Sequence, residues 1–191
     1  MNILIRFFDI LFSSAAIVIL SPLFITVSII LLLTGEGKVI YRQTRIGKFQ
    51  KEFKLFKFVT MLENSEFIGT QDLTIKNDPR ILPFGRFLRN SKINELLQLL
   101  NVLNGDMTLV GFRPQTPNAF NLFSLEGRDL ISLNQPGLTG VGSIVFSNEE
   151  SLLDFAGDDS LNFHKSVIVP HKEQLEIWWV KNRSLLNYFY A

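Results

Sequence analysis

Three residues in the middle of the chain carry side chains suited to phosphate chemistry. Asn94 and Glu95 are adjacent, and Arg113 lies between Gly111 and Pro114 at the expected end of a strand. A guanidinium there can bind a phosphate group through two parallel hydrogen bonds. Mg²⁺ is usually held by one or two carboxylates together with substrate phosphates, so Glu95 is a candidate ligand for one Mg²⁺. The alternative for Glu95 is that it only stabilises a helix turn, and the alternative for Arg113 is that it is a buried structural arginine.

The residues around Glu95 have the pattern of an amphipathic helix. Ser91 is a candidate N-cap, and Gly105 stands where a helix end favours a positive φ. Apolar residues recur at helical spacing between them, at Ile93, Leu96, Leu97, Leu100 and Leu103. We therefore predict a helix over residues 91–105 with Glu95 in its first turn, where the helix dipole stabilises a carboxylate by roughly 0.3–1 kcal/mol.

Short elements flank this helix on both sides. Residues 39–62 have the pattern of a β-hairpin with its turn at Gly47, and residues 63–78 that of a loop or short helix. A basic amphipathic stretch over residues 78–89 is suited to a membrane interface. We predict a strand over residues 107–110 and, after a glycine-bearing turn, a second over residues 144–146. A single helix is expected to end the chain.

The first 34 residues are almost wholly apolar. As a straight helix, the segment would be about 45 Å long, against a hydrocarbon core of ~30 Å. Pro22 is expected to kink or break this helix, and the Ser21 hydroxyl is the nearest partner for a freed carbonyl. Basic residues from Lys38 to Lys57 indicate that the C-terminal flank is cytoplasmic. A spanning helix and a re-entrant hairpin are both compatible with this pattern.

Composition excludes several classes of protein. The chain has 191 residues, enough for one domain and a membrane element, and its formal net charge of +1 argues against nucleic-acid binding. It contains no cysteine, which excludes disulfides and thiolate metal sites. His164 and His171 have no companions at metal-ligand spacing, and the glycines of residues 136–142 match no nucleotide-binding fingerprint.

An ordered series of short blocks resembles the small bacterial sugar transferases, the monotopic phosphoglycosyl transferases. The similarity spans nearly the whole chain. The blocks are residues 8–10 (FDI) with Ser21-Pro22, 41–47 (YRQTRIG), 57–61 (KFVTM), 77–81 (NDPRI), 85–89 (GRFLR), 94–99 (NELLQL), 101–103 (NVL), 105–114 (GDMTLVGFRP) and 136–140 (PGLTG).

The resemblance implies a fold and a location. The fold is α+β: a re-entrant membrane helix hairpin over residues 1–34, broken at Ser21-Pro22, precedes a small mixed domain over residues 35–191. That domain would combine amphipathic interfacial helices with short β-strands. It would work at the cytoplasmic face of the bacterial inner membrane, in contact with lipid, and the hairpin becomes the preferred form of the apolar segment.

The resemblance also implies a reaction. A sugar-1-phosphate would pass from a UDP-sugar donor to polyprenol phosphate with release of UMP, assisted by Mg²⁺. This is the first membrane step in assembling lipopolysaccharide, capsule or glycoprotein glycans. The catalytic pair falls on Asn94 and Glu95, with Glu95 as metal ligand, and we assign Arg113, Arg80 and Lys57 to substrate phosphates. Candidate protein partners are downstream glycosyltransferases and a second copy of the chain.

The chain departs from the family pattern at its centre. The family's usual nucleophilic Asp is replaced by Asn94, and a neutral amide cannot act as a carboxylate nucleophile. Val59, Leu97 and Phe112 stand where Arg, Pro and Pro are common. Either Glu95 takes over the nucleophilic role, or the chain is a catalytically silent variant that serves as a membrane binding or scaffold module.

Overall fold

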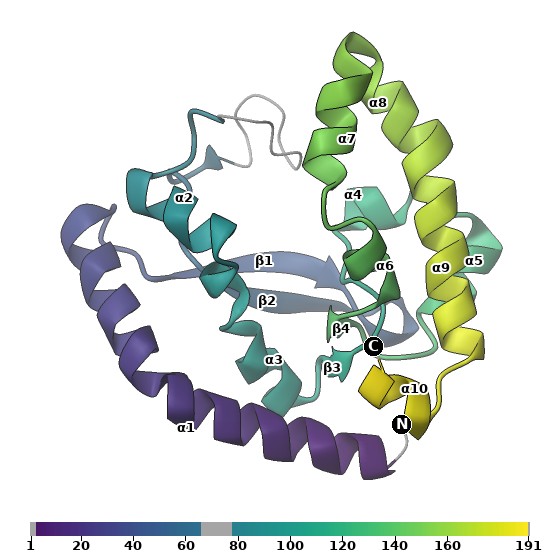
Figure 1. The fold of residues 1–191 in the computed structure, drawn as a ribbon, viewed down its shortest axis with the longest axis horizontal. Coiled ribbons are helices and arrows are strands. Elements are labelled where there is room, and N and C mark those ends of the chain that lie inside the picture. The colour runs from purple at the N-terminus through teal and green to yellow at the C-terminus, as the bar shows by residue number, and fades with distance from the viewer. Residues whose placement is uncertain (1–2, 66–77, 191) are drawn as a thin grey trace.

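The structure is a computed structural model that describes residues 3–65 and 78–190. Its N-terminal helix α1 (Ile3–Thr34) is continuous and contains Pro22. Figure 1 shows that α1 bends near its middle and wraps around one side of the molecule. The Ser21 hydroxyl donates to the Val18 carbonyl at 2.8 Å, and the Thr26 hydroxyl donates to the Pro22 carbonyl at 2.9 Å. The expected kink is therefore present as a bend, whereas two separate antiparallel arms are not seen.

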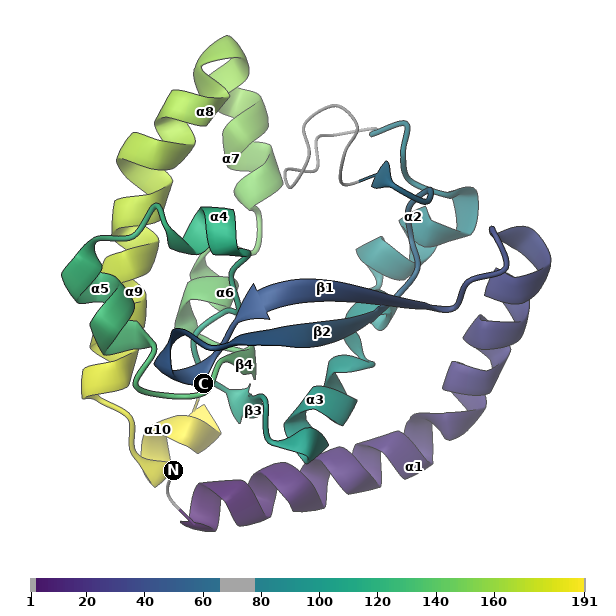
Figure 2. The same ribbon diagram turned by 180° about the vertical axis from the view of Figure 1, so that it is seen from behind.

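A twisted β-hairpin lies on the concave side of α1 (Figure 2). Its strands β1 (Ile40–Ile46) and β2 (Glu52–Phe58) pair antiparallel, and the 3₁₀ turn η1 (Lys48–Gln50) lies between them. This confirms the predicted hairpin. Tyr41 lies opposite Lys57 and Arg45 lies opposite Phe53. Because side chains alternate along a strand and opposite residues share a face, Arg45 and Lys57 belong to the same face.

The predicted helix over residues 91–105 is divided. Helix α2 (Pro83–Asn90) ends at Ser91, whose hydroxyl donates to the Phe87 carbonyl at 2.8 Å. The prediction that Ser91 is an N-cap was therefore wrong. The chain then forms the 3₁₀ turn η3 (Ile93–Glu95) and helix α3 (Gln98–Asn104), which ends at Gly105 with φ +89° as expected. Glu95 thus lies in a turn before α3 and not in its first turn.

A small parallel sheet follows, formed by β3 (Thr108–Val110) and β4 (Gly137–Thr139). A Cβ atom at Gly137 would lie 2.0 Å from the Gly111 nitrogen, and one at Gly140 would lie 1.9 Å from the Gly111 oxygen. Gly137 and Gly140 therefore allow the backbone of residues 137–140 to pack directly against Gly111, in the segment that carries Arg113.

The predicted strand over residues 144–146 was wrong, because helix α6 (Val141–Val145) occupies this region. A Cβ atom at Gly142 would lie 2.4 Å from Oε1 of Glu176, so the first turn of α6 packs directly on this buried side chain. This tertiary contact overrides the strand preference of the apolar run.

The remaining helical elements all follow β3 in the chain. They are α4 (Pro117–Phe120), α5 (Leu125–Ile131), α7 (Glu149–Ala156), the 3₁₀ turn η4 (Gly157–Asp159), α8 (Ser160–Phe163), a π-helical turn (His164–Ile168), α9 (Val169–Lys181) and α10 (Leu185–Tyr190). The prediction of one C-terminal helix was wrong, because the helix is interrupted between α9 and α10. The backbone and side-chain amides of Asn182 both donate to the Trp178 carbonyl, at 3.0 and 2.8 Å, and end α9 there.

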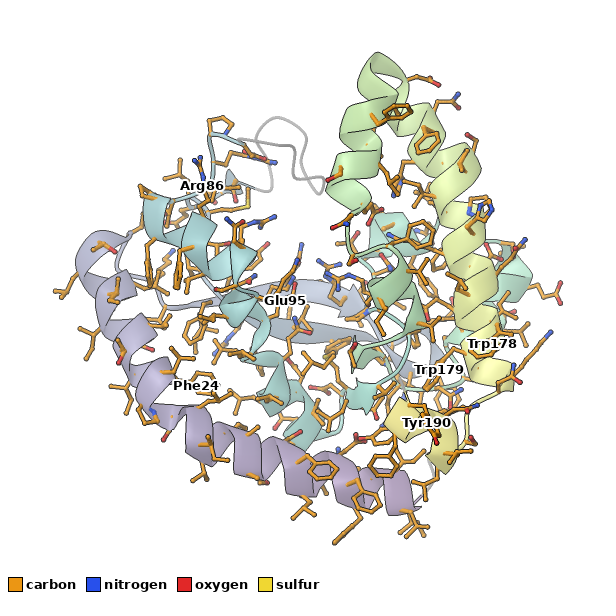
Figure 3. The ribbon with its side chains drawn as sticks, viewed as in Figure 1. Phe24, Arg86, Glu95, Trp178, Trp179 and Tyr190 are labelled. Atoms are coloured by element: carbon orange, nitrogen blue, oxygen red, sulfur yellow. The ribbon has the colours of Figure 1, made fainter. Side chains whose placement is uncertain are left out.

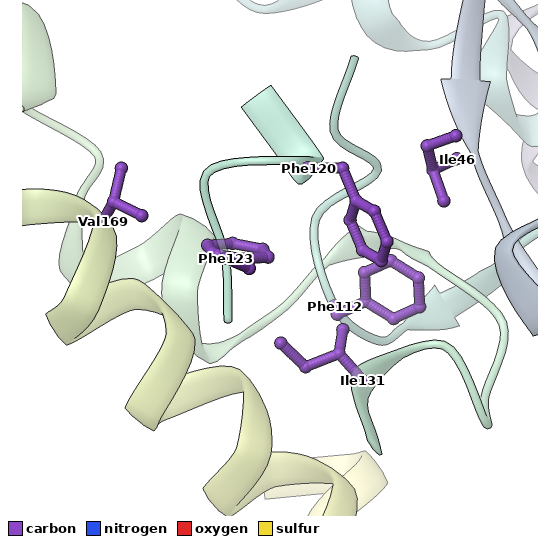
Figure 4. Close-up of a cluster of buried hydrophobic side chains, with 6 residues drawn as sticks. All are labelled: Ile46, Phe112, Phe120, Phe123, Ile131 and Val169. Carbon is purple, nitrogen blue, oxygen red and sulfur yellow. The ribbon is translucent and has the colours of Figure 1, made fainter. Parts of the chain in front are cut away.

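Separate apolar clusters join these elements. One cluster, shown in Figure 4, consists of Ile46, Phe112, Phe120, Phe123, Ile131 and Val169, and its member Phe112 directly precedes Arg113 in the chain. A second joins Val27 and Leu31 of α1 to Phe58, Leu88 and Leu97. A third joins Ile5 of α1 to Val110, Trp179 and Tyr188. Both halves of α1 therefore pack against the same body, and Phe24 points toward it in Figure 3.

Candidate active site

The face of the hairpin that carries Arg45 and Lys57 forms one wall of a charged pocket. Glu95 and Gln98 contribute from η3 and α3, and Arg113 contributes from the loop after β3. Leu55, Pro114, Gly137 and Leu138 complete its lining, and its free volume is about 10 Å³, close to what a single water molecule needs. Figure 3 shows Glu95 near the centre of the molecule, where these elements meet.

Glu95 lies between two cations. Its Oε1 atom is 3.6 Å from Nζ of Lys57 and 3.5 Å from Nη2 of Arg113. The side chains of Lys57 and Glu95 are about 17 and 18% exposed, whereas that of Arg113 is 41% exposed. These contacts are longer than a close charge-assisted hydrogen bond of about 2.7–2.9 Å. The three side chains have to move apart to admit a phosphate, and no tight ion pair opposes that movement.

The pocket shifts the ionisation of its own groups. Burial would raise the pKa of Glu95, but the nearby cations, led by Lys57 and Arg113, outweigh burial and lower this pKa to about 2. Burial lowers the pKa of Lys57 to about 7, and the charges of Arg45, Arg113 and Arg89 add to the decrease while Glu95 opposes it. Glu95 is thus ionised at neutral pH, and Lys57 titrates close to neutrality.

Two contacts hold the backbone around Arg113. The Arg113 backbone N–H donates to Oε1 of Glu176 at 3.2 Å, and Nη1 of Arg45 donates to the Pro114 carbonyl at 3.1 Å. Glu176 comes from α9 and is 3% exposed. Burial raises the pKa of its carboxyl group to about 7. The loop is therefore held from the hairpin on one side and from α9 on the other.

The predicted site residues do not all meet in this pocket. Lys57, Glu95 and Arg113 come together, whereas Asn94 is buried beside the pocket, does not line it, and its Oδ1 atom accepts no hydrogen bond within the described residues. Arg80 is also buried, with its Nη2 atom 2.5 Å from Oδ2 of Asp78, and it does not line the pocket. Ser21 and Pro22 lie at the bend of α1.

Sequence reasoning missed Arg45, Gln98 and Glu176. Arg45 could have been found, because the register of the predicted hairpin places it on the face of Lys57. Gln98 falls one helical turn after Glu95, a spacing that shares a face only if the helix is continuous. Glu176 carried no local signal, since its role depends on how α9 packs against residues 111–114.

The pocket fits Mg²⁺ only together with a phosphate ligand. Within residues 3–65 and 78–190, no group of three or more His, Cys, Asp or Glu side chains is arranged to hold a metal ion. Glu95 is the one carboxylate among the described residues that line the pocket, and three cations surround it. A bare divalent cation is disfavoured there by charge, whereas a diphosphate would supply the missing oxygen ligands and negative charge.

Comparison with known proteins identifies the family. The family model described as bacterial sugar transferase matches residues 1–190. The chain is 34% identical to an uncharacterized sugar transferase of Haemophilus influenzae over 97% of its own length and 38% of that protein. It is 32% identical to the undecaprenyl-phosphate galactose phosphotransferase of Salmonella typhimurium, over 95% of this chain and 37% of the relative.

A third relative is the UDP-N-acetylgalactosamine-undecaprenyl-phosphate N-acetylgalactosaminephosphotransferase of Aeromonas hydrophila. It is 34% identical over 73% of this chain and 33% of its own length. The chain thus spans less than two-fifths of the length of these three relatives. Since the family model matches from the start of α1 through α10, the chain belongs to the bacterial sugar transferase family.

Proposed function

We propose that the chain is a phosphoglycosyl transferase, which moves a sugar-1-phosphate from a UDP-sugar to polyprenol phosphate and releases UMP. The observation that carries this proposal is the ionised Glu95 carboxylate held 3.5–3.6 Å from two cations in one pocket. Once its side chains move apart, such a pocket can bind a diphosphate and place a carboxylate beside its phosphorus. Two relatives are named for transfer to undecaprenyl phosphate, which supplies the acceptor, and the name of one of them includes a UDP-sugar, which supplies the donor.

The first step uses Glu95 as the nucleophile. One Glu95 oxygen attacks the sugar-linked phosphorus, a carboxylate–phosphorus bond forms, and the bond from that phosphorus to the bridging oxygen breaks. UMP leaves with the bonding electron pair. In the second step a phosphate oxygen of polyprenol phosphate attacks the same phosphorus, and Glu95 departs as a carboxylate. Glu95 is assigned this role because Asn94 is neutral and does not line the pocket.

The surrounding cations bind the phosphates and stabilise negative charge on the transferred group. Arg113, partly exposed, is placed to form two parallel hydrogen bonds with phosphate oxygens, and Arg45 and Lys57 face the same pocket. Mg²⁺, when bound through Glu95 and the donor diphosphate, would neutralise charge on the departing UMP. Arg80 is assigned a structural role, because its guanidinium is engaged by Asp78 and by the Ser65 carbonyl at 2.8 Å.

The second candidate function is a silent membrane module of the same fold. The neutral Asn94 favours it, because the family's nucleophilic position then lacks a carboxylate. UMP release by the purified chain, with Mg²⁺, undecaprenyl phosphate and a panel of UDP-sugars, distinguishes the two. The transferase proposal expects release by the unmodified chain. Release by Asn94→Asp alone would instead identify the unmodified chain as the silent variant.

We further propose that α1 enters and leaves the membrane by the same, cytoplasmic, face. Among the described residues, α1 is the one helix long and apolar enough to cross a membrane. Near its start, Arg6 donates to the carbonyls of Val102 and Leu103 at 2.5 and 2.7 Å. Near its end, Val27 and Leu31 pack in the cluster with Phe58. A spanning helix would separate these two sets of contacts by the bilayer, so their presence on one body supports the re-entrant form.

Cysteine labelling tests this topology, because the chain has no cysteine of its own. Asn2→Cys and Lys51→Cys should react from the same side in intact cells, and both should resist a membrane-impermeant reagent applied outside. Opposite sidedness would establish a spanning helix.

A further inference from the structure

A second, apolar groove lies between the end of α1 and the start of α2, and we call it the α1–α2 groove. Figures 1 and 2 both show these two ends side by side. Ile30, Leu31 and Thr34 line it from α1, and Leu82, Pro83 and Phe84 line it from the start of α2. Its volume is about 250 Å³, slightly below the range of about 300–1,000 Å³ common for sites that hold a whole small molecule, so it would hold a section of a longer ligand.

The groove is continuous with the apolar outer surface of α1. Ile29, Leu32 and Leu33 are exposed on the turns that border it. On the other side, exposed Phe87 stacks on Phe84 with ring centroids 5.8 Å apart, which extends the apolar surface along α2. If the outer face of α1 lies in lipid, the groove opens to the hydrocarbon region, and an apolar chain is the ligand that this lining fits.

Helix α2 connects the groove to the charged pocket. It begins in the groove at Pro83 and ends at Asn90, a length of about 12 Å at ~1.5 Å per residue, and the turn that carries Glu95 follows directly. Arg89 lies in the last turn of α2, and its charge is among those that lower the pKa of Lys57. A phosphate in the pocket and an apolar tail in the groove can therefore belong to one molecule that lies along α2.

We infer that the α1–α2 groove binds the isoprenoid chain of the polyprenol phosphate acceptor. This inference rests on the proposed function for the identity of the ligand. The groove selects the acceptor by its chain, whereas the pocket around Glu95 binds its phosphate. A chain too short to extend past α2 gains nothing from the groove, so acceptor preference should depend on chain length.

Filling the groove tests this dependence. Thr34 is exposed and lines the groove, and its neighbour Leu33 is 79% exposed and does not line it. Thr34→Trp should raise the KM for undecaprenyl phosphate about tenfold, the equivalent of burying roughly two fewer methylene groups. The KM for geranyl phosphate, which has two isoprene units, and the KM for the UDP-sugar should not change, and Leu33→Trp should leave all three unchanged. An equal rise for both acceptors, or no rise, would overturn the inference.

Cross-linking separates this inference from the proposed reaction, because it needs no turnover. A photo-reactive phenylalanine analogue at position 34 of the purified chain in detergent should label with undecaprenyl phosphate several-fold more than the same analogue at position 33. Unlabelled undecaprenyl phosphate should compete, and excess phosphatidylglycerol should not. Labelling without UMP release would leave the groove assigned and remove the proposed reaction. Equal labelling at both positions, or equal competition by the phospholipid, would show that the groove does not select the isoprenoid chain.

Discussion

Two carboxylates of this chain are held in opposite ways. Asp9 of α1 is fully buried and accepts hydrogen bonds from the Thr108 hydroxyl, the Leu109 backbone N–H and the Tyr188 hydroxyl, at 2.7–2.9 Å. Glu95 is partly exposed and faces Lys57 and Arg113 at 3.5–3.6 Å. Asp9 thus accepts short hydrogen bonds from neutral donors, whereas Glu95 faces positively charged groups at longer distances.

This difference separates an anchoring group from a reactive one. The donors around Asp9 come from β3 and α10, so the carboxylate ties the start of α1 to both. Its oxygens are occupied, and a ligand would have to break short bonds in a buried site. The cations around Glu95 keep it ionised, and their long contacts with it can open to admit a phosphate. Removing Glu95 should therefore affect chemistry, and removing a partner of Asp9 should affect stability.

The largest expected effect is that of Glu95→Gln on turnover. The amide has nearly the same shape but cannot attack phosphorus, so UMP release should fall by at least about 100-fold. The thermal unfolding midpoint should also fall, because the cations that lower the pKa of Glu95 favour its ionised form in the folded chain, but the variant should remain folded at the assay temperature. Retention of more than a tenth of the rate would remove the distinction between the two carboxylates.

Next in size is the effect of Tyr188→Phe on stability. The change removes one donor to the buried Asp9, and because Leu109 and Thr108 still donate to the same oxygen, the cost is that of one hydrogen bond, about 0.5–1.5 kcal/mol of unfolding free energy. Tyr190→Phe is the matched control, since Tyr190 is 82% exposed. Denaturation in detergent measures both variants. Equal stability of the two would mean that Asp9 does not anchor α1 through Tyr188.

A smaller, pH-dependent effect is expected at Lys57. Because its pKa is lowered to about 7, its positive charge is lost as the pH rises through neutrality, and a bound diphosphate favours the charged form. The Kd for UDP should therefore rise by about tenfold between pH 7 and pH 9. Lys57→Arg should flatten this dependence, since arginine stays charged. Titration calorimetry at several pH values provides the measurement, and an unchanged slope in the variant would contradict the role of Lys57.

The smallest expected effect is that of Arg45→Lys. Lysine keeps the charge but cannot form the paired hydrogen bonds of Arg45 with the Gln43 side chain and the Pro114 carbonyl. We expect a several-fold decrease in kcat with little change in unfolding midpoint. A decrease as large as that of Glu95→Gln would instead mean that Arg45 is part of the reactive group.

The sequence predicted those features of the fold that local patterns determine. The hairpin, the strand before Arg113 and the positive φ of Gly105 follow from alternation, turn residues and a helix end. Of the residues assigned to the site, Lys57, Glu95 and Arg113 lie together in one pocket, whereas Arg80 and Asn94 do not line it. The prediction that Ser91 begins a helix was wrong because a serine can also lie at the C-terminal end of a helix, as it does here after α2, and packing determines which end it occupies.

Contacts distant in sequence could not be predicted. Nothing in the sequence around Asp9 points to its partners, because Thr108 and Tyr188 lie 99 and 179 residues away. Glu176 supports Arg113 from 63 residues away. The helix over residues 141–145 likewise depends on the packing of Gly142 against Glu176. The apolar residues of this segment alone do not predict that contact.

The most direct test of the central claim is to locate the transferred phosphate on the protein. The purified chain is incubated with Mg²⁺ and a UDP-sugar labelled in the sugar-linked phosphate, without acceptor, and the labelled peptide is fragmented by mass spectrometry. Our account predicts a phosphosugar attached to Glu95, absent from Glu95→Gln and removed by adding undecaprenyl phosphate. UMP release with Glu95 unlabelled, or with the phosphosugar on another residue, would contradict it.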